Sequence, residues 1–254
     1  MLLGGGRNRF EQPLAAGGTT NVVDYAKSKG YQYVTDASGL EAAKANKPLL
    51  GLFTPVNMTT EWNGPIATLG DGTPAQRCVT NNRPANEPSL PAMTTKALSL
   101  LQGDKDGFFL QVEGASIDKQ DHAANACAQI GETVAFDQAI GVALDYQRKH
   151  PDTLVVVNAD HSHTSQIVGE DTTGNGNSTG YSNNLITRDD QVMRVSYATA
   201  GGIARPAVPP SQQHTGAAVP VYAGGPGASA ILGTTDHTDL FPLLQGDALH
   251  GGHH

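Results

Sequence analysis

The stretch Val112-Glu113-Gly114-Ala115-Ser116-Ile117-Asp118-Lys119-Gln120-Asp121-His122-Ala123-Ala124-Asn125 decides the fold, because it carries carboxylates and a histidine directly after an apolar run. Residues 107–112 predict a short buried strand, and α/β proteins keep their chemistry at the carboxyl ends of such strands. Asp118 and His122 stand at i and i+4, so one helical turn puts both side chains on one face. Such a pair suits a zinc ion. An isolated pair of this kind is also compatible with a capped helix start that carries a surface histidine.

A second polar cluster, Asn158-Ala159-Asp160-His161-Ser162-His163, follows the apolar run at residues 154–157. This run predicts another strand, so both clusters are expected at the carboxyl edge of one sheet. Two strand ends that carry Asp and His within one domain indicate a site assembled from distant segments. The residues between the clusters predict one long helix at 130–150, which Pro151 ends.

Three stretches predict irregular structure. Residues 54–91 are rich in Pro, Asn, Thr and Gly and predict a long loop, which is unusual in a compact domain unless it is functional or held down. Residues 170–190 are polar and predict an exposed excursion without chemistry. Residues 250–254 predict a flexible tail, whose histidines are able to bind adventitious metal.

Composition and charge narrow the function classes. The chain has 254 residues, 38% of them hydrophobic and 16% charged, as is ordinary for a globular protein with one good-sized core. The net charge of −8 argues against a nucleic-acid-binding surface, which needs clustered Lys and Arg. No apolar run predicts a membrane span, and the first residues lack the pattern of a signal peptide.

Several long sequence words resemble the alkaline phosphatases, specifically the bacterial, periplasmic type. They are VEGASIDKQDHAAN at 112–125, QIGETV at 129–134, ADHSHTSQIV at 159–168, QHTGAAVPVYAGGPGA at 213–228 and TDLF at 238–241. The resemblance implies an α/β fold of three αβα layers around a central, mostly parallel sheet. It also implies that residues 1–254 form a single partial domain, the carboxyl-terminal portion of the family fold without its amino-terminal half.

The same resemblance implies hydrolysis of phosphate monoesters at a site with two zinc ions and one magnesium ion, through a phosphoseryl intermediate. Two metal ions about 4 Å apart stabilise the attacking and leaving oxygens of such a displacement. A lone histidine in a loop, such as His214, is more often solvated than ligating, but here it matches a family zinc ligand. Carried over by position, the ligands are Asp118, His122 and His214 for the first zinc, Asp160 and His161 for the second zinc, and Glu113 for magnesium.

Two further residues match family positions outside the metal ligands. His163 matches a residue that orients Asp118. Lys119 matches a lysine that holds phosphate through water in several bacterial members, or else it is a solvated surface charge. The family's nucleophilic serine, phosphate-clamping arginine and bridging aspartate have no counterpart here, and Ser116 does not match the nucleophile.

Two alternatives to a phosphatase remain open on the sequence. The first is a zinc-binding half-domain that no longer hydrolyses anything. The second is a sulfatase or phosphodiesterase of the same superfamily. The second alternative is disfavoured, because the word at residues 112–125 is phosphatase-like throughout.

Cys78 and Cys127 are the two cysteines of the chain, and on their own they are compatible with two unrelated buried thiols. The resemblance implies that they form a disulfide, which indicates an oxidising compartment and hence a periplasmic or secreted protein. It also implies phosphate monoesters and inorganic phosphate as ligands, and a homodimer in the full-length family member.

Overall fold

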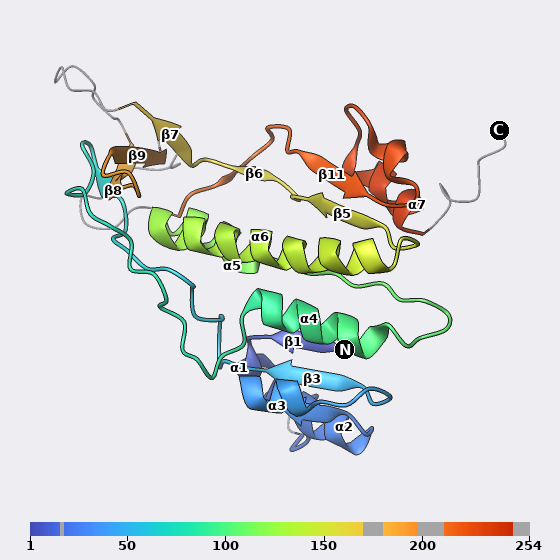
Figure 1. Ribbon diagram of the computed structural model, residues 1–254. Helices are drawn as coiled ribbons and strands as arrows, with labels where there is room; N and C mark the ends of the chain where they lie inside the picture. The colour runs from blue at the N-terminus through green and yellow to red at the C-terminus, as the bar shows by residue number, and fades with distance from the viewer. Residues whose placement is uncertain (16–17, 170–179, 198–210, 246–254) are drawn as a thin grey trace.

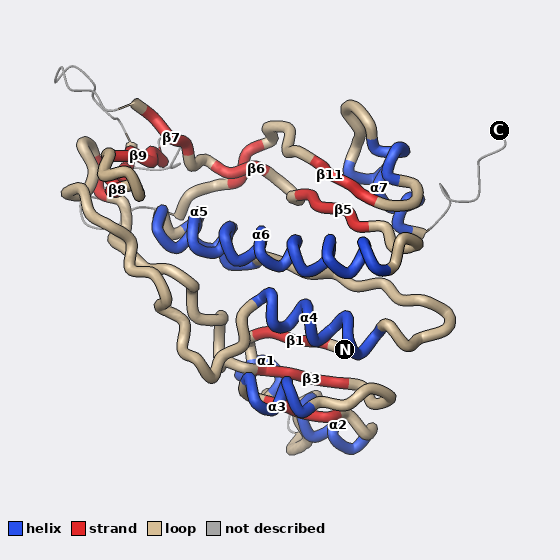
Figure 2. Tube along the Cα trace, in the orientation of Figure 1, coloured by secondary structure: helices blue, strands red, loops and turns tan. Residues whose placement is uncertain are grey.

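The computed structural model describes residues 1–15, 18–169, 180–197 and 211–245. Figures 1 and 2 show short strands at both ends of the molecule and two long helices between them. The elements in chain order are β1 (Leu2–Gly4), α1 (Arg7–Phe10), α2 (Val22–Ser28), β2 (Gln32–Val34), α3 (Ala37–Ala42), β3 (Leu49–Leu52), β4 (Thr68–Leu69), α4 (Leu90–Leu101), α5 (Ala115–His122), α6 (Ala126–Lys149), β5 (Val155–Asn158), β6 (Ser162–His163), β7 (Gln166–Val168), β8 (Tyr181–Ile186), β9 (Val192–Tyr197), β10 (His214–Thr215), β11 (Val221–Gly224), η1 (Ala228–Ile231), η2 (His237–Asp239) and α7 (Leu240–Leu244).

The first part of the chain builds a three-stranded parallel sheet in the order β1-β3-β2. All four residues of β3 are buried, as expected for a central parallel strand that is covered on both faces. On one face, Leu49 packs with residues of α3 and α4, including Leu40 and Met93. On the other face, Leu50 and Leu52 pack with Val23 of α2.

Helices α4 and α6 pack against each other in the middle of the molecule (Figure 1). The parallel sheet lies beyond α4, and the β5–β11 ribbon lies beyond α6. β5 and β11 pair antiparallel, and Ile231, Leu240 and Leu243 of η1 and α7 cover one face of this ribbon. The long helix expected at 130–150 begins earlier, because the Asn125 side chain accepts a hydrogen bond from the Ala128 amide and caps α6.

The α/β class is confirmed, but the described strands form four separate sheets rather than one. The buried strand expected at residues 107–112 is wrong: this segment is irregular, and Phe109 in it is 67% exposed. A strand needs a neighbour for its backbone hydrogen bonds, and no described segment pairs with these residues. The expected shared carboxyl edge of one sheet is therefore absent from the described residues, although both polar clusters still meet.

The expectation of an exposed excursion at 170–190 is wrong for its described part. Residues 170–179 lie outside the described residues, but Tyr181–Ile186 forms β8, most of which is buried. Polar residues tolerate this burial because they are hydrogen-bonded. The Asn183 amide nitrogen donates to the Pro65 carbonyl, and its oxygen accepts from the Ala126 amide. The tail at 250–254 lies outside the described residues.

The long segment 54–89 holds one two-residue strand, β4, and is fastened to the rest of the molecule by polar contacts. The carboxylate of Glu87 accepts from the amide and the hydroxyl of Thr59 at 2.6 and 2.9 Å. The Glu61 amide donates to Oε1 of Glu132 on α6 at 2.8 Å. A loop of this length therefore follows a defined course over α6.

A disulfide between Cys78 and Cys127 joins this segment to the first turn of α6, as the sequence words implied. Gly64 and Gly131 allow residues 62–64 to lie close against α6. A Cβ on Gly64 would lie 2.4 Å from Cys127 Sγ, and a Cβ on Gly131 would lie 2.5 Å from Trp62 Cγ. Across the described residues, no helix has the length and apolar character needed to cross a bilayer.

Gly131→Ala is expected to lower the free energy of unfolding by about 2–3 kcal/mol, because the new methyl group collides with the Trp62 backbone and ring. Gly141→Ala on the same helix is the matched control, because its Cβ meets nothing within 4 Å. Removing that glycine is expected to raise the free energy of unfolding by up to about 1 kcal/mol. Urea unfolding followed by Trp62 fluorescence measures both, and equal effects of the two substitutions would contradict the close packing of residues 62–64 on α6.

Glu132→Gln is expected to make the free energy of unfolding less dependent on pH. Burial raises the pKa of Glu132 above its ordinary value of 4.5, and nearby Glu61 adds to this while the Glu61 amide and Arg83 oppose it. Because the folded pKa exceeds the unfolded one, the contribution of Glu132 to stability is greatest below pH 4.5 and is lost as the pH rises through the folded pKa. The glutamine keeps the acceptor oxygen without this loss. The free energy of unfolding of Glu132→Gln relative to the parent, from urea unfolding between pH 4 and about 8, should therefore rise with pH. A difference that stays constant over this range would contradict a raised pKa at Glu132.

Candidate metal centre

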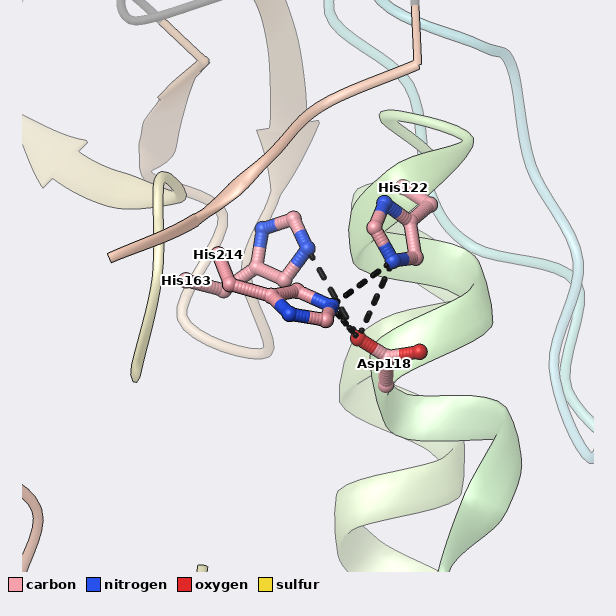
Figure 3. A group of neighbouring side chains, drawn as sticks. All are labelled: Asp118, His122, His163 and His214. Carbon is pink, nitrogen blue, oxygen red and sulfur yellow. Dashed lines mark hydrogen bonds and ion pairs between the residues drawn. The ribbon is translucent and has the colours of Figure 1, made fainter. Parts of the chain in front are cut away.

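Helix α5 places Asp118 and His122 one turn apart on the same face (Figure 3). The Nε2 atom of His122 lies 3.3 Å from Oδ1 of Asp118. The Asp118 side chain is 39% exposed and the His122 side chain 30%, so the pair faces a partly open space. The sequence spacing predicted this arrangement correctly.

Two short strands bring further histidines to the same carboxylate. β6 and β10 pair antiparallel, with His163 opposite His214 in the register. Nε2 of His214 lies 3.1 Å from Oδ1 of Asp118, and Nε2 of His163 lies 3.8 Å from the same oxygen. Figure 3 shows all three imidazoles turned toward Asp118.

The geometry of Asp118, His122 and His214 fits one cation. The Nε2 atoms of His122 and His214 lie 3.0 Å apart. Oδ1 of Asp118 lies 3.1 Å from Nε2 of His214 and 3.3 Å from Nε2 of His122. A tetrahedral zinc ion with bonds of about 2.0–2.1 Å holds its ligand atoms roughly 3.3 Å apart. These residues, together with His163, offer ligand atoms that all lie within 4.8 Å of one another.

The hydrogen bond at the far side of the His122 ring leaves Nε2 free for a metal. Nδ1 of His122 faces the backbone carbonyl of Gln212 in a short hydrogen bond. A carbonyl oxygen only accepts, so Nδ1 carries the proton. In the neutral ring Nε2 then has the lone pair, as a metal ligand requires.

His163 has the opposite arrangement. The Thr164 amide donates to Nδ1 of His163 at 3.0 Å, so Nδ1 holds the lone pair and Nε2 the proton in the neutral ring. Nε2 is buried and has no hydrogen-bond partner among the described residues, and it faces Asp118. Burial, with His122 adding, lowers the pKa of His163 to about 4, so the ring is neutral at pH 7. A neutral ring with its proton on Nε2 turns that N–H toward the carboxylate, at a separation too long for a hydrogen bond, and offers no lone pair to a metal.

His161 and Asp160 lie beside this group and offer two ligand atoms for a second ion. Nε2 of His161 is 3.5 Å from Oδ2 of Asp160 and 3.8 Å from Oδ1 of Asp118. Nδ1 of His161 donates to the Ser162 carbonyl at 3.2 Å, which again leaves Nε2 free. The Asp160 side chain is 89% exposed, so this pair is open to solvent.

Glu113 and Lys119 are not drawn into the group. Both are exposed, and neither forms a hydrogen bond or ion pair through its side chain with any described residue. Glu113 lies two residues before α5, and Lys119 follows Asp118 within it. The described residues therefore offer three converging ligands for a first ion and two for a second. For magnesium they offer one candidate carboxylate, Glu113.

Thr164 and Gln212 contribute to the site although sequence reasoning missed them. Neither residue ionises, and no spacing pattern in the sequence marks either one. Their roles follow only from the hydrogen bonds that they make to His163 and His122.

Comparisons with known proteins give the family of the chain. A family model described as alkaline phosphatase matches residues 1–208. The alkaline phosphatase of Escherichia coli K12 is 46% identical over 254 residues, covering 96% of this chain and 51% of its own length. The streptomycin-6-phosphate phosphatase of Streptomyces griseus is 45% identical, covering 95% and 54%. The chain thus spans about half the length of these relatives.

The fold has a solved counterpart in the alkaline phosphatase of the Antarctic bacterium TAB5. The two superpose with a TM-score of 0.69 at 21% identity, over 98% of this chain and 59% of the other. At this identity the likeness concerns the fold.

Asp118→Ala is expected to weaken Zn²⁺ binding at least about 100-fold, because it removes the carboxylate on which the imidazoles converge. Asp137→Ala, at an exposed position of α6, is the control and should leave affinity unchanged. Titration against a competing chelator measures both. Equal affinities of the two variants would contradict a metal site at Asp118.

Proposed function

Since the chain belongs to the alkaline phosphatase family, we propose that it supplies the metal-binding part of an enzyme that hydrolyses phosphate monoesters. The observation that carries this proposal is the convergence of the Asp118, His122 and His214 ligand atoms at 3.0–3.3 Å from one another. The sequence words that match the family contain these three residues.

In this proposal, zinc is held by Asp118, His122 and His214, and a second zinc by Asp160 and His161 with a further ligand from outside these residues. Glu113 contributes to a magnesium site. When bound, such ions supply positive charge to the phosphate oxygens and lower the pKa of an oxygen nucleophile. The acidic chain, with a net charge of −8, otherwise has few cations to offer an anionic substrate.

Residues of this chain set which ring nitrogens are protonated and how the candidate ligands are oriented. The protonated Nε2 of His163 faces Asp118 at 3.8 Å from Oδ1, while the Gln212 carbonyl keeps the lone pair on Nε2 of His122 free. Lys119, exposed beside Asp118, contacts phosphate through water. The serine that forms the phosphoseryl intermediate, the phosphate-clamping arginine and the bridging aspartate come from residues outside these 254.

We propose a periplasmic or secreted location and assembly of the whole enzyme as a homodimer. The disulfide between Cys78 and Cys127 supports the first, because such bonds persist in oxidising compartments. The relatives from Escherichia coli and Streptomyces griseus are bacterial, and the oxidising compartments of a bacterium are the periplasm and the exterior.

A second candidate is a zinc-binding half-domain without catalysis. It is favoured by one observation, the grouping of four ligand atoms within 4.8 Å once His163 is included. Four protein ligands close a zinc site, as is typical of structural zinc. The Thr164 amide on Nδ1 of His163 argues against this candidate, because it puts the proton on Nε2.

Zinc content and hydrolysis of p-nitrophenyl phosphate, measured on one sample at alkaline pH, test the proposal. We expect the 254 residues to bind zinc through Asp118 without turnover, because the nucleophile is missing. Co-expression with the remaining half of a bacterial relative should then give turnover, and Asp118→Ala should abolish it.

Turnover by these 254 residues without a partner would place the nucleophile within them and contradict the proposed division of the site. Tight zinc binding with no turnover after co-expression, although the two halves associate, would favour the half-domain.

A further inference from the structure

Gln212 is fully buried and joins three segments of the candidate metal centre. Its backbone amide donates to the His122 carbonyl at 3.0 Å, and its backbone carbonyl accepts from Nδ1 of the His122 ring. The backbone of Gln212 therefore clamps the main chain and the side chain of one residue at once. This fixes the end of α5 against the segment that leads into β10.

The Gln212 side chain is held from the β6 side. The Thr164 hydroxyl donates to Oε1 of Gln212 at 3.3 Å, and Thr164 is itself 5% exposed. The same threonine donates its backbone amide to Nδ1 of His163. Thr164 thus contacts His163 directly, and His122 through Gln212.

The pair decides which ring nitrogen carries the proton in two neighbouring histidines. The carbonyl of Gln212 requires a proton on Nδ1 of His122, whereas the amide of Thr164 requires a lone pair on Nδ1 of His163. As a result, the two Nε2 atoms that face Asp118 differ: that of His122 presents a lone pair, and that of His163 presents a proton. The rings touch edge to face, with centroids 4.8 Å apart, and the Ser211 hydroxyl, 3.3 Å from Nδ1 of His122, is a further acceptor for the proton on that nitrogen.

Gln212 also sets the position of another candidate ligand. His214 lies two residues further on, in β10, where it pairs with His163 of β6. A shift of Gln212 would move His122 and His214 relative to each other, although 92 residues separate them.

We propose that Thr164 and Gln212 act together as positioning residues, which assign opposite tautomers to His122 and His163 and align His122 with His214 for one metal ion. This inference rests on the proposed function only in that the group binds metal. Neither residue contacts the metal or the substrate.

The tautomers can be measured in the metal-free protein at pH 8 by long-range ¹H–¹⁵N correlation of the imidazole rings. His122 is expected to carry its proton on Nδ1 and His163 on Nε2. The same tautomer in both rings would overturn the proposal, and this measurement on the parent needs no variant to fold.

Variants test the alignment through Zn²⁺ affinity, measured with a competing chelator. Thr164→Val and Gln212→Met are each expected to lower affinity about 10-fold, because both remove the side-chain contact that holds the backbone of residue 212 against His122. Thr164→Ser keeps the hydroxyl and should restore affinity to within about threefold of the parent. Gln213→Met, the same change at the exposed neighbouring position, is the matched control and should have no effect.

Affinity within about twofold of the parent in both Thr164→Val and Gln212→Met would overturn the proposal, as would an equal loss in Gln213→Met. These outcomes differ from failure of the proposed function. A protein that binds zinc with the expected tautomers but gives no turnover with the remaining half would contradict the phosphatase alone.

Discussion

The histidines of the site are arranged around the Asp118 carboxylate, which lies one turn before His122 on α5. One oxygen of this carboxylate lies within 3.8 Å of Nε2 atoms from His122, His161, His163 and His214. These residues come from a helix, two short strands and the turn after β5. Such a concentration of imidazoles around one carboxylate is stable only if each ring carries its proton on the nitrogen that keeps lone pairs from facing one another, because such lone pairs repel. The backbone hydrogen bonds behind the rings supply that arrangement.

The position of α5 depends in turn on the start of α6 and on the long segment that crosses it. Ala124 turns the chain between the two helices with a φ of 52°, and its carbonyl accepts from the Ala67 amide. Cys127, one residue into α6, is bonded to Cys78, and Gly64 lies against the disulfide. A loop that looks irregular in sequence thus anchors the junction next to His122. We infer that the loop is held down because the metal centre needs a fixed α5.

Sequence spacing predicted the part of the site that lies within one helix. It failed for residues whose position depends on pairing between strands that are distant in the sequence. The i, i+4 spacing was sufficient for Asp118 and His122, because a helical turn brings them together without any partner. His214 could be assigned only by resemblance, since its place depends on β10 pairing with β6. The strand expected at 107–112 is irregular, because an apolar run forms a strand only beside another strand. β8 was missed for the opposite reason: Ser182 and Asn183 resemble loop residues but are buried and hydrogen-bonded.

Charge explains why the site takes this form in an acidic chain. Asp118 contributes one negative charge, and the neutral rings of His122 and His214 contribute none, so a divalent cation bound there would keep a net positive charge. A site with more carboxylates would cancel that charge and lose attraction for a phosphate ester. The His163 ring faces Asp118 without adding a charge, because burial keeps that ring neutral. Imidazoles with assigned protons would therefore hold a divalent cation while leaving half of its charge available to an anionic ligand.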